Sequence, residues 1–455
     1  MHSRIGAAIV AFTVIIFAGC SGTSQSNLTP APGGGAGMPP SAVSWASANK
    51  PSLTQESVIY TFQGGSDGGN PFAGLLARSR ELYGTTFSGG TGPSGGNGTV
   101  FKLSPSGTKS ILYTFQGGTD AANPQAGLIR KNGVLYGDTD YGGGATQCTG
   151  GCGAVFALTP SGSAYTERVI YAFQGGSDGA SPVGGLLSDA SGALYGTTVD
   201  GGGATACTGL TPGCGTVFKL TPSGSNYTET VLHSFQGGSD GAGPRGTLIA
   251  DNTGALYGTT YYGGSGTCSD PSGFTGCGTA FKLTPSGSGY IESVIYNFQG
   301  GTNDGANPRS ALLRKNGALY GATTHGGAHG AGTVFELTGS SYTERVLYSF
   351  LGGRDGRSPS DEDGLRADSN GALYGTTTFG GVAVCVAGCG TVFKLTPSGS
   401  NYTETVLHRF QGPGDGKNPR GSVTAGVAGA LYGTTSGGAN HACSGGCGTV
   451  FKVAP

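Results

Sequence analysis

Charged residues are scarce in this sequence, and the two signs nearly balance. Lys, Arg, Asp and Glu make up 11% of the 455 residues, and the formal net charge at pH 7 is -1. Without a basic stripe, nucleic acids and anionic membrane surfaces are poor candidates as partners. A Ser/His/Asp order, a metal motif, a phosphate-binding loop and a carboxylate pair are missing as well. The sequence therefore points to no catalytic residue and no cofactor, and it favours a non-enzymatic role without excluding an enzyme.

A long hydrophobic run is also missing. The apolar segment 5–17 follows Arg4, is too short to span a bilayer, and leads into Phe17-Ala18-Gly19-Cys20. It resembles a bacterial lipoprotein signal with its lipobox, which implies a signal peptide over residues 1–19 and lipidation of Cys20; the alternative is an ordinary secretory signal. Residues 20–54, rich in Ser, Gly and Pro, would form a flexible tether. We expect an exported protein that faces the periplasm or the cell exterior and contacts the membrane only through this anchor.

Glycine is what the chain has in excess, with 94 residues. By composition alone, this would suggest low complexity or disorder. The glycines, however, fall at fixed offsets between short β-branched and aromatic runs, which is typical of a repeat fold. The tripeptide Leu-Tyr-Gly marks seven copies, which start at Leu82, Leu135, Leu194, Leu256, Leu319, Leu373 and Leu431.

Each copy carries four strand-sized runs. Two connections are short Gly/Asn/Ser turns that suit hairpins, and the other two are longer and more variable. Four antiparallel strands per repeat are typical of a kelch-like propeller, whereas a β-solenoid has shorter repeats. We therefore predict an all-β, seven-bladed propeller over residues 55–455. The chain enters with a fourth-type strand, 58–62, and ends with a third-type strand, 449–452. The N-terminal strand should therefore complete the last blade and close the ring.

Three linked motifs, "LYGTT", "GTVFKL" and "SFQGGSDG..P", recur over about residues 57–455. They resemble the tandem repeat called GloVer, which is found in bacterial surface proteins. The resemblance implies a propeller at the cell surface, and it brings no established activity or catalytic residues. This chain departs from the family in its lipobox-like anchor and in its unequal loops.

Cysteines support export independently. Besides Cys20, all of them lie between the second and third strand of a blade, and blades one and five lack both members of the pair. Presence or absence as pairs is what disulfides require in an oxidising compartment. A metal would find only two ligands in each loop. We predict five local disulfides: Cys148 with Cys152, Cys207 with Cys214, Cys268 with Cys277, Cys385 with Cys389, and Cys443 with Cys447.

The order of short and long connections defines two faces of the propeller. The "QGGSDG..P" links and the cysteine loops should emerge together on one face, which we call the long-loop face, and the tight turns on the other, the hairpin face. A ligand site is expected on the long-loop face. Tyr83, Tyr195 and their equivalents are interpreted as packing residues. The Asp that recurs in each link is interpreted as a turn cap, with calcium binding as the alternative; it is Asp67, Asp120, Asp178, Asp240, Asp304, Asp355 and Asp415.

Charged residues that break the repeat are the candidate ligand-binding residues. Arg follows the link proline in three blades, and blade six carries the insertion "SDEDG" close to two further Arg. Arg beside acidic groups could bind a polar or anionic ligand such as a uronic sugar, and the alternative is a solvated rim. The set is Arg245, Arg309, Arg420, Arg354, Arg357, Asp361, Glu362 and Asp363.

The histidines give a weaker signal. His325, His329 and His441 should lie on the long-loop face, but blades five and seven are not neighbours and no carboxylate lies at a fixed spacing, so we predict no metal site. His233 and His408 replace Tyr in outer strands and are interpreted as structural.

Two functional classes remain. The favoured one is a monomeric surface module that binds a carbohydrate or a protein ligand on its long-loop face. The other is an extracytoplasmic hydrolase or lyase that acts on a polysaccharide, which rests on the analogy with other propellers.

Overall fold

The computed structural model describes residues 56–454 except 92–95, 163, 208–211, 225, 270–273, 361–362, 400 and 427–428. The predicted signal peptide, the lipidated Cys20 and the tether lie outside the described residues, as do Asp361 and Glu362. Within the described part of the chain, no helix combines the length and the apolar character needed to cross a lipid bilayer.

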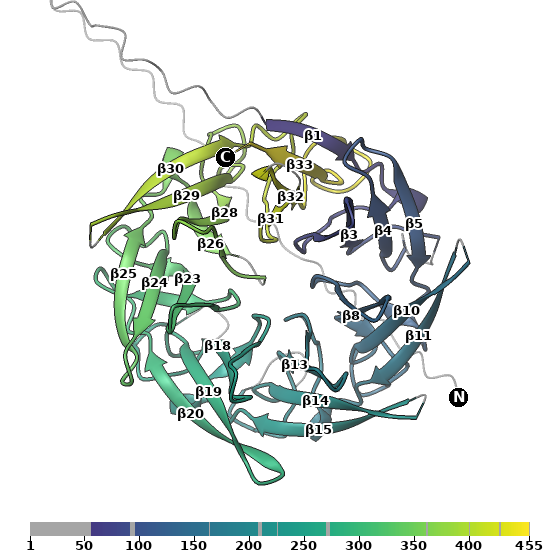
Figure 1. Ribbon diagram of the computed structural model, residues 1–455, viewed down its shortest axis with the longest axis horizontal. Coiled ribbons are helices and arrows are strands. Elements are labelled where there is room, and N and C mark those ends of the chain that lie inside the picture. The colour runs from purple at the N-terminus through teal and green to yellow at the C-terminus, as the bar shows by residue number, and fades with distance from the viewer. Residues whose placement is uncertain are drawn as a thin grey trace, which may run out of the picture. The chain divides into compact units, whose positions relative to one another are not determined.

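Seven antiparallel sheets are arranged in a ring around a central channel, each forming one blade (Figure 1). Blades one to three run, from the channel outward, β2 (Leu76–Arg78), β3 (Glu81–Thr86), β4 (Thr99–Leu103) and β5 (Lys109–Thr114); β7 (Ile129–Lys131), β8 (Val134–Thr139), β10 (Ala154–Ser161) and β11 (Ala164–Ala172); and β12 (Leu187–Ser188), β13 (Leu194–Thr198), β14 (Thr216–Ser223) and β15 (Asn226–Ser234). The predicted seven-bladed all-β propeller is confirmed.

In blades four to six the inner strand is split into two pieces that pair with the same neighbour. These blades contain β16 (Ala242–Pro244), β17 (Ile249–Ala250), β18 (Leu256–Tyr262), β19 (Thr279–Ser286) and β20 (Gly289–Asn297); β21 (Gly305–Pro308), β22 (Leu313–Lys315), β23 (Ala318–Gly326), β24 (Thr333–Thr338) and β25 (Thr343–Ser349); and β26 (Arg357–Ser360), β27 (Arg366–Ala367), β28 (Leu373–Phe379), β29 (Thr391–Ser398) and β30 (Asn401–Arg409). In blade two, β6 (Ala121–Ala122) and β9 (Tyr141–Gly142) form the corresponding outlying pair.

Blade seven joins the two ends of the described chain. It consists of β31 (Thr424–Ala425), β32 (Leu431–Thr435), β33 (Thr449–Val453) and, outermost, β1 (Glu56–Thr61). Strand β1 pairs antiparallel with β33, from Glu56 opposite Val453 to Thr61 opposite Thr449. This is the predicted closure by the N-terminal strand: β1 covers the outer edge of β33 and itself becomes the outer strand of the blade.

The same aromatic contact recurs at all seven junctions between blades. A Phe that follows the outer strand of one blade meets the Phe of the third strand in the next blade edge to face, with ring centroids 5.0 to 5.2 Å apart. The ring of the second Phe lies on the glycine of Leu-Tyr-Gly. A Cβ at Gly258, for example, would come within 2.5 Å of Cζ of Phe281. The repeat therefore keeps glycine here because the aromatic core fills the space of a side chain.

Every outer strand contains a β-bulge. In blade three, Val231 lies opposite Phe218 and His233 lies opposite Val217. Strand β15 therefore advances by two residues where β14 advances by one. The extra residue reverses the side on which the following residues point. Glu229 therefore faces the preceding blade, whereas His233 faces the following one. The same register shift occurs in the other six blades.

The links and the cysteine loops share one face, as predicted. The five expected disulfides are all formed. Each lies against the glycine that directly follows the link Gln at the end of its blade, as Cys207 and Cys214 lie against Gly237. In blades one and five, Asn97 and Ala331 stand in the place of the second Cys and contact the equivalent glycines. The five disulfides indicate an exported protein.

The link aspartates cap turns, as predicted. Asp240, for example, accepts a hydrogen bond from the backbone N–H of Gln236 at 2.6 Å, and its carboxylate lies 3.2 Å from Nε2 of His233 in the preceding outer strand. In five blades a Tyr hydroxyl takes the place of the His ring, as Tyr296 does with Asp304 at 3.0 Å. Each carboxylate therefore fixes its link to the outer rim.

Candidate functional site

A pocket of 420 Å³ opens on the long-loop face at the junction of blades two, three and four. The residues that line it include Gln125, Asp140, Tyr141, Asp200 and Arg245. Asp140 and Asp200 follow the second strands β8 and β13, and Arg245 follows β16, the first piece of the inner strand of blade four. The propeller geometry thus brings equivalent positions of consecutive blades together around one hollow.

The polar groups of this pocket are held in place. Nε2 of Gln125 donates a hydrogen bond to a carboxylate oxygen of Asp140 at 2.7 Å, and Asp140 is buried. The guanidinium of Arg245 lies over the ring of Tyr261, 5.7 Å from its centroid. A carboxylate and a guanidinium fixed in this way are preorganised for hydrogen bonds to a ligand, because little side-chain entropy is lost on binding.

The electrostatics of the pocket single out Asp200. Burial raises the pKa of Asp200 to about 6; Arg245 opposes this rise, and the negative charge of Asp140 adds to it. The same two carboxylates raise the pKa of Tyr141, with Asp140 as the larger cause. Two carboxyl groups and one Arg therefore share the pocket. Such a set can accept hydrogen bonds from hydroxyl groups and donate bidentate bonds to a carboxylate.

The other Arg candidates lie elsewhere around the mouth of the channel. Arg420 lies over the ring of Phe72 at 4.7 Å, and Arg357 lies over that of Phe379 at 5.4 Å. Arg309 is partly buried at the equivalent position of blade five, and Arg354 is exposed in a short 3-10 helix, η5 (Gly353–Asp355). Of the predicted Arg residues, Arg245 alone lines the 420 Å³ pocket.

Asp363, from the blade-six insertion, reaches across the channel. A carboxylate oxygen of Asp363 accepts a hydrogen bond from the backbone N–H of Gly74 in blade one at 2.6 Å. Asp363 also lines the 490 Å³ hollow of the channel itself, whose wall includes the apolar side chains of Leu76, Ile129 and Leu313. The insertion therefore brings a carboxylate into a mostly apolar channel.

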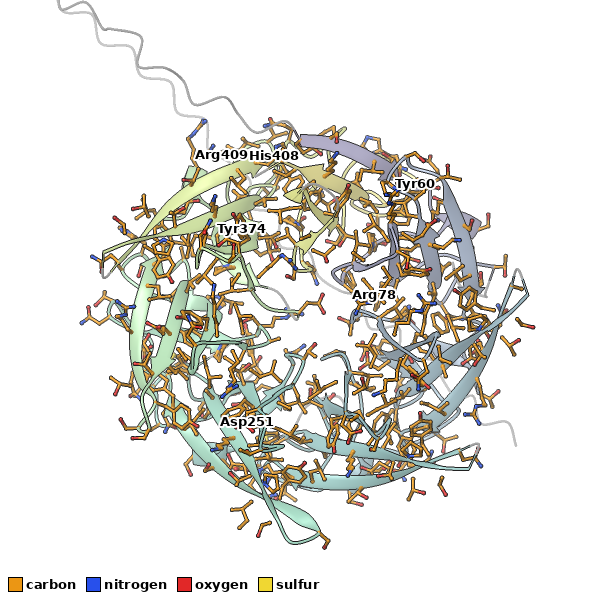
Figure 2. The ribbon with its side chains drawn as sticks, in the orientation of Figure 1. Tyr60, Arg78, Asp251, Tyr374, His408 and Arg409 are labelled. Atoms are coloured by element: carbon orange, nitrogen blue, oxygen red, sulfur yellow. A yellow bond between two sulfur atoms is a disulfide. The ribbon has the colours of Figure 1, made fainter. Side chains whose placement is uncertain are left out.

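The histidines divide into two groups. His325 hydrogen-bonds through Nδ1 with Thr324 at 3.0 Å, and His441 lines another pocket of the long-loop face, between blades six and seven. His233 and His408 lie in the outer strands β15 and β30. Figure 2 shows His408 and Tyr60 near the outer rim and Arg78 nearer the channel. Among the described residues, the side chains grouped closely enough to hold a metal ion are His233 with Asp240 and Glu292, and His408 with Asp415 and Glu56.

Sequence reasoning missed both the pocket carboxylates and these rim groups. A signal for the pocket was present, because blade two reads "LYGDTDYG" where five other blades read "LYGTT", which introduces Asp138 and Asp140. For the rim, Glu precedes the Tyr or His of the outer strand by four residues in six blades. That spacing alone does not reveal that the bulge turns the two side chains toward different neighbours.

Comparisons with solved structures find a Bacteroides uniformis protein assigned by prediction as a 6-phosphogluconolactonase (13% identity, 78% of this chain and 89% of that one, TM-score 0.49). They also find a puromycin-hydrolysing peptidase of Mycobacterium tuberculosis (9% identity, 82% and 52%, TM-score 0.47) and a protein from Lactobacillus plantarum (12% identity, 78% and 89%, TM-score 0.46). None of these likenesses says what this chain binds or does.

Protein families give a more specific result. No curated protein sequence matches the chain. The sequence model of the Gloeobacter/Verrucomicrobia repeat, in contrast, matches residues 47–270 and again residues 266–455. Together the two matches cover the whole propeller and agree with the motifs that the seven blades share. The chain belongs to the family of Gloeobacter/Verrucomicrobia repeat proteins.

Proposed function

We propose that this propeller is a binding module for a carbohydrate, and that the ligand occupies the pocket formed by Gln125, Asp140, Asp200 and Arg245. The observation that carries the proposal is the convergence of these groups in one 420 Å³ hollow of the long-loop face. Sugars present many hydroxyl groups that can donate hydrogen bonds to the two carboxylates, and the Tyr141 ring offers an apolar surface beside them. Arg245 favours a sugar that carries a carboxylate, because it can bind that group bidentately.

The test is a binding screen of the purified full-length chain against polysaccharides with and without uronic acids, followed by calorimetry on any that bind. Losing a hydrogen bond to a charged group costs about 1.5–3 kcal/mol, so Arg245→Ala should weaken the binding of a uronic polymer about 10- to 150-fold. The melting temperature should stay nearly unchanged, because Arg245 lies at the surface of the pocket. Arg314→Ala, an exposed change in the hairpin β22–β23, is the matched control. Equal losses in both variants would exclude this pocket.

A polysaccharide-acting hydrolase or lyase is the second candidate. One observation favours it: the pKa of Asp200 is raised to about 6 beside a second carboxyl group, Asp140, which is a pattern seen in general acid–base pairs. Product analysis of each bound polymer decides between the two functions. New reducing ends or unsaturated products that disappear in Asp200→Asn would identify an enzyme, and an unchanged polymer would leave the binding function.

We further propose that the protein is anchored by a lipid on Cys20 and functions as a monomer at the cell surface. The proposal rests on the sequence Phe17-Ala18-Gly19-Cys20 after a short apolar run. Cys20→Ala should abolish labelling by a fatty-acid analogue and release the protein from the membrane fraction. A variant that stays membrane-bound with unchanged mobility would exclude this anchor.

A further inference from the structure

Two of the seven blade junctions differ from the others in a way that matters for metal chemistry. At each junction, a side chain from the outer strand of one blade and the link Asp lie beside a side chain from the outer strand of the next blade. Five junctions place a Tyr hydroxyl on the link Asp, and two place an imidazole there. The two exceptions are His233 with Asp240 and His408 with Asp415, and in both the neighbouring blade adds a Glu.

We propose that each of these two groups binds one divalent transition-metal ion, with Zn²⁺ as the probe. The ligands would be Nε2 of the His, a carboxylate oxygen of the link Asp and a carboxylate oxygen of the Glu from the next blade. Imidazole nitrogen and carboxylate oxygen are ordinary zinc ligands, and three protein ligands with one water complete a tetrahedral site.

The distances suit this geometry. Nε2 of His233 lies 3.2 and 3.3 Å from the two carboxylate oxygens of Asp240, and Nε2 of His408 lies 3.0 Å from one oxygen of Asp415. Two ligands on a tetrahedral zinc are roughly 3.3 Å apart when each metal–ligand bond is about 2.0 Å long. In each group, all three ligand atoms lie within 4.8 Å of one another.

The Glu is the group that most clearly needs a positive partner. One carboxylate oxygen of Glu292 and one of Glu56 are buried without a hydrogen-bond partner among the described residues, as is one oxygen of the equivalent Glu at the four Tyr junctions that carry Glu; only the His junctions add an imidazole nitrogen beside it. A buried carboxylate that faces a second carboxylate is costly when charged. A bound cation would offset that cost, and it would take up the oxygen that lacks a partner.

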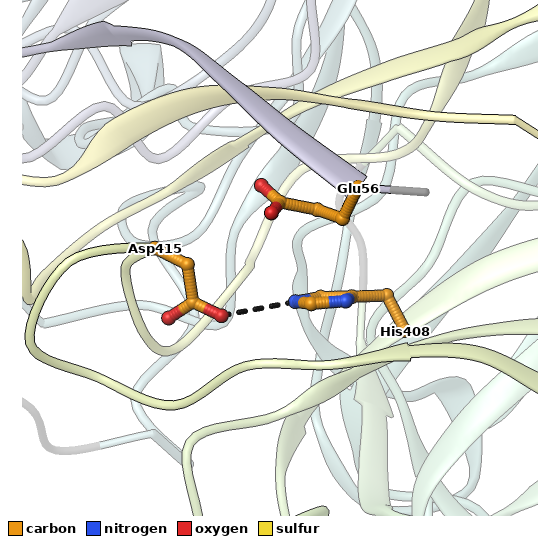
Figure 3. Close-up of side chains that lie close together, drawn as sticks. All are labelled: Glu56, His408 and Asp415. Carbon is orange, nitrogen blue, oxygen red and sulfur yellow. Dashed lines mark hydrogen bonds and ion pairs between the residues drawn. The ribbon is translucent and has the colours of Figure 1, made fainter. Parts of the chain in front are cut away.

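The second site has a structural consequence. Figure 3 shows Glu56, His408 and Asp415 pointing toward one another, with Glu56 projecting from β1, and His408 and Asp415 coming from β30 and the loop after it. Because β1 belongs to blade seven, an ion bound here would join the strand that closes the ring to blade six. Zinc at this junction would therefore slow the opening of β1.

The experiment measures zinc in the untagged full-length chain by elemental analysis after dialysis against zinc and then against buffer. We expect two ions per chain, one in each of the single variants His233→Tyr and His408→Tyr, and none at these sites in the double variant. Tyr is the residue found at the other five junctions, so these variants should keep the fold. The double variant retains His325, His329 and His441, which controls for binding on the long-loop face. Equal zinc content in the wild type and the double variant would overturn the proposal.

Two further measurements test the ligand set and the effect of zinc on β1. Glu56→Gln with Glu292→Gln leaves both His residues in place and should also lose the two ions; retention of both ions would contradict the proposed ligand set. Hydrogen exchange of β1 should slow at least several-fold on adding zinc to the wild type, and should not respond to zinc in His408→Tyr. A zinc effect on β1 of the same size in both proteins would exclude the second site.

Discussion

The ammonium nitrogen of Lys109 lies 2.7 Å from a carboxylate oxygen of Asp67. Lys109 occupies the outer-strand position at which the other six blades carry Glu. Its side chain is only 4% exposed, and its ammonium group also lies 5.1 Å from the centroid of the Tyr60 ring. Asp67 and Tyr60 belong to the link and the outer strand at the junction of blades seven and one. This junction of blades seven and one, the closing junction, therefore has an ion pair where the other six junctions have two carboxyl groups.

Replacing Lys109 should weaken this junction. Removing one partner of a buried ion pair leaves the other charge uncompensated, so Lys109→Met should lower the free energy of unfolding by on the order of 3 kcal/mol in urea titrations. Lys219→Met is the control, because Lys219 lies over the Tyr195 ring at 5.4 Å and should contribute only about 1 kcal/mol. Equal stability of the two variants would show that the ion pair does not strengthen the closing junction.

The propeller should lose stability as the pH rises through neutrality. Burial is the main cause that raises the pKa of Glu167 to about 7 and those of Glu344 and Glu404 to about 8, and the facing link Asp adds to each shift. A carboxyl whose pKa is higher in the folded state than in the unfolded state stabilises fully below the unfolded value near 4.3, and this contribution is lost as the pH rises through the folded value. The melting temperature in a buffer with chelator should therefore fall between pH 5 and pH 9.

Glu344→Gln separates this effect from general alkaline destabilisation. The amide has no proton to lose, so the variant should melt at a higher temperature than the wild type at pH 9 and at a similar temperature at pH 5. A difference of the same size at both pH values would mean that Glu344 does not titrate in this range.

The glycine of Leu-Tyr-Gly should tolerate no side chain. In Gly258→Ala the new Cβ would approach Cζ of Phe281 to 2.5 Å, so the ring must move within a packed core. Overpacking of this kind costs about 1–3 kcal/mol, which denaturant unfolding can measure. Gly289→Ala is the matched control, since its Cβ would meet no atom closer than 4.0 Å, from Ser286. A smaller loss at Gly258 than at Gly289 would contradict this account of the repeat.

Disulfide loss should have a local effect. The loops closed by Cys207–Cys214 and the other pairs span separations of only 4 to 9 residues, so each bond removes little entropy from the unfolded chain and contributes about 2 kcal/mol. Cys207→Ala with Cys214→Ala should increase hydrogen exchange in the loop and in the link around Gly237, and leave the circular dichroism unchanged. Unfolding of the whole ring would show that the disulfides hold the blades together.

Much of the architecture could be predicted from the sequence because it depends on short-range patterns. The seven copies, the closing strand and the local cysteine pairs all follow from spacing along the chain. The turn-capping role of residues such as Asp240 was predictable for the same reason, since the backbone N–H that donates a hydrogen bond to it lies four residues away.

The polar groups gathered from different blades could not be predicted in this way. Asp140, Asp200 and Arg245 come from three blades, and the distances between them depend on how the blades pack. The groups at His233 and His408 depend in addition on the β-bulge, which turns Glu292 and Glu56 toward the preceding blade. A bulge adds one residue to a strand, and nothing in the alternation of apolar and polar residues marks its position here.

The pairing of β1 with β33 also sets the order of events during biosynthesis. The partner of β1, β33, is synthesised only after almost the whole propeller. Strand β1 therefore stays unpaired longer than any other outer strand. During this interval its backbone donors and acceptors are open to any other strand. Contacts so distant along the chain form slowly. Completion of the last blade is therefore the folding step at which a chain that is being synthesised or exported in an unfolded state is most exposed to wrong strand pairing.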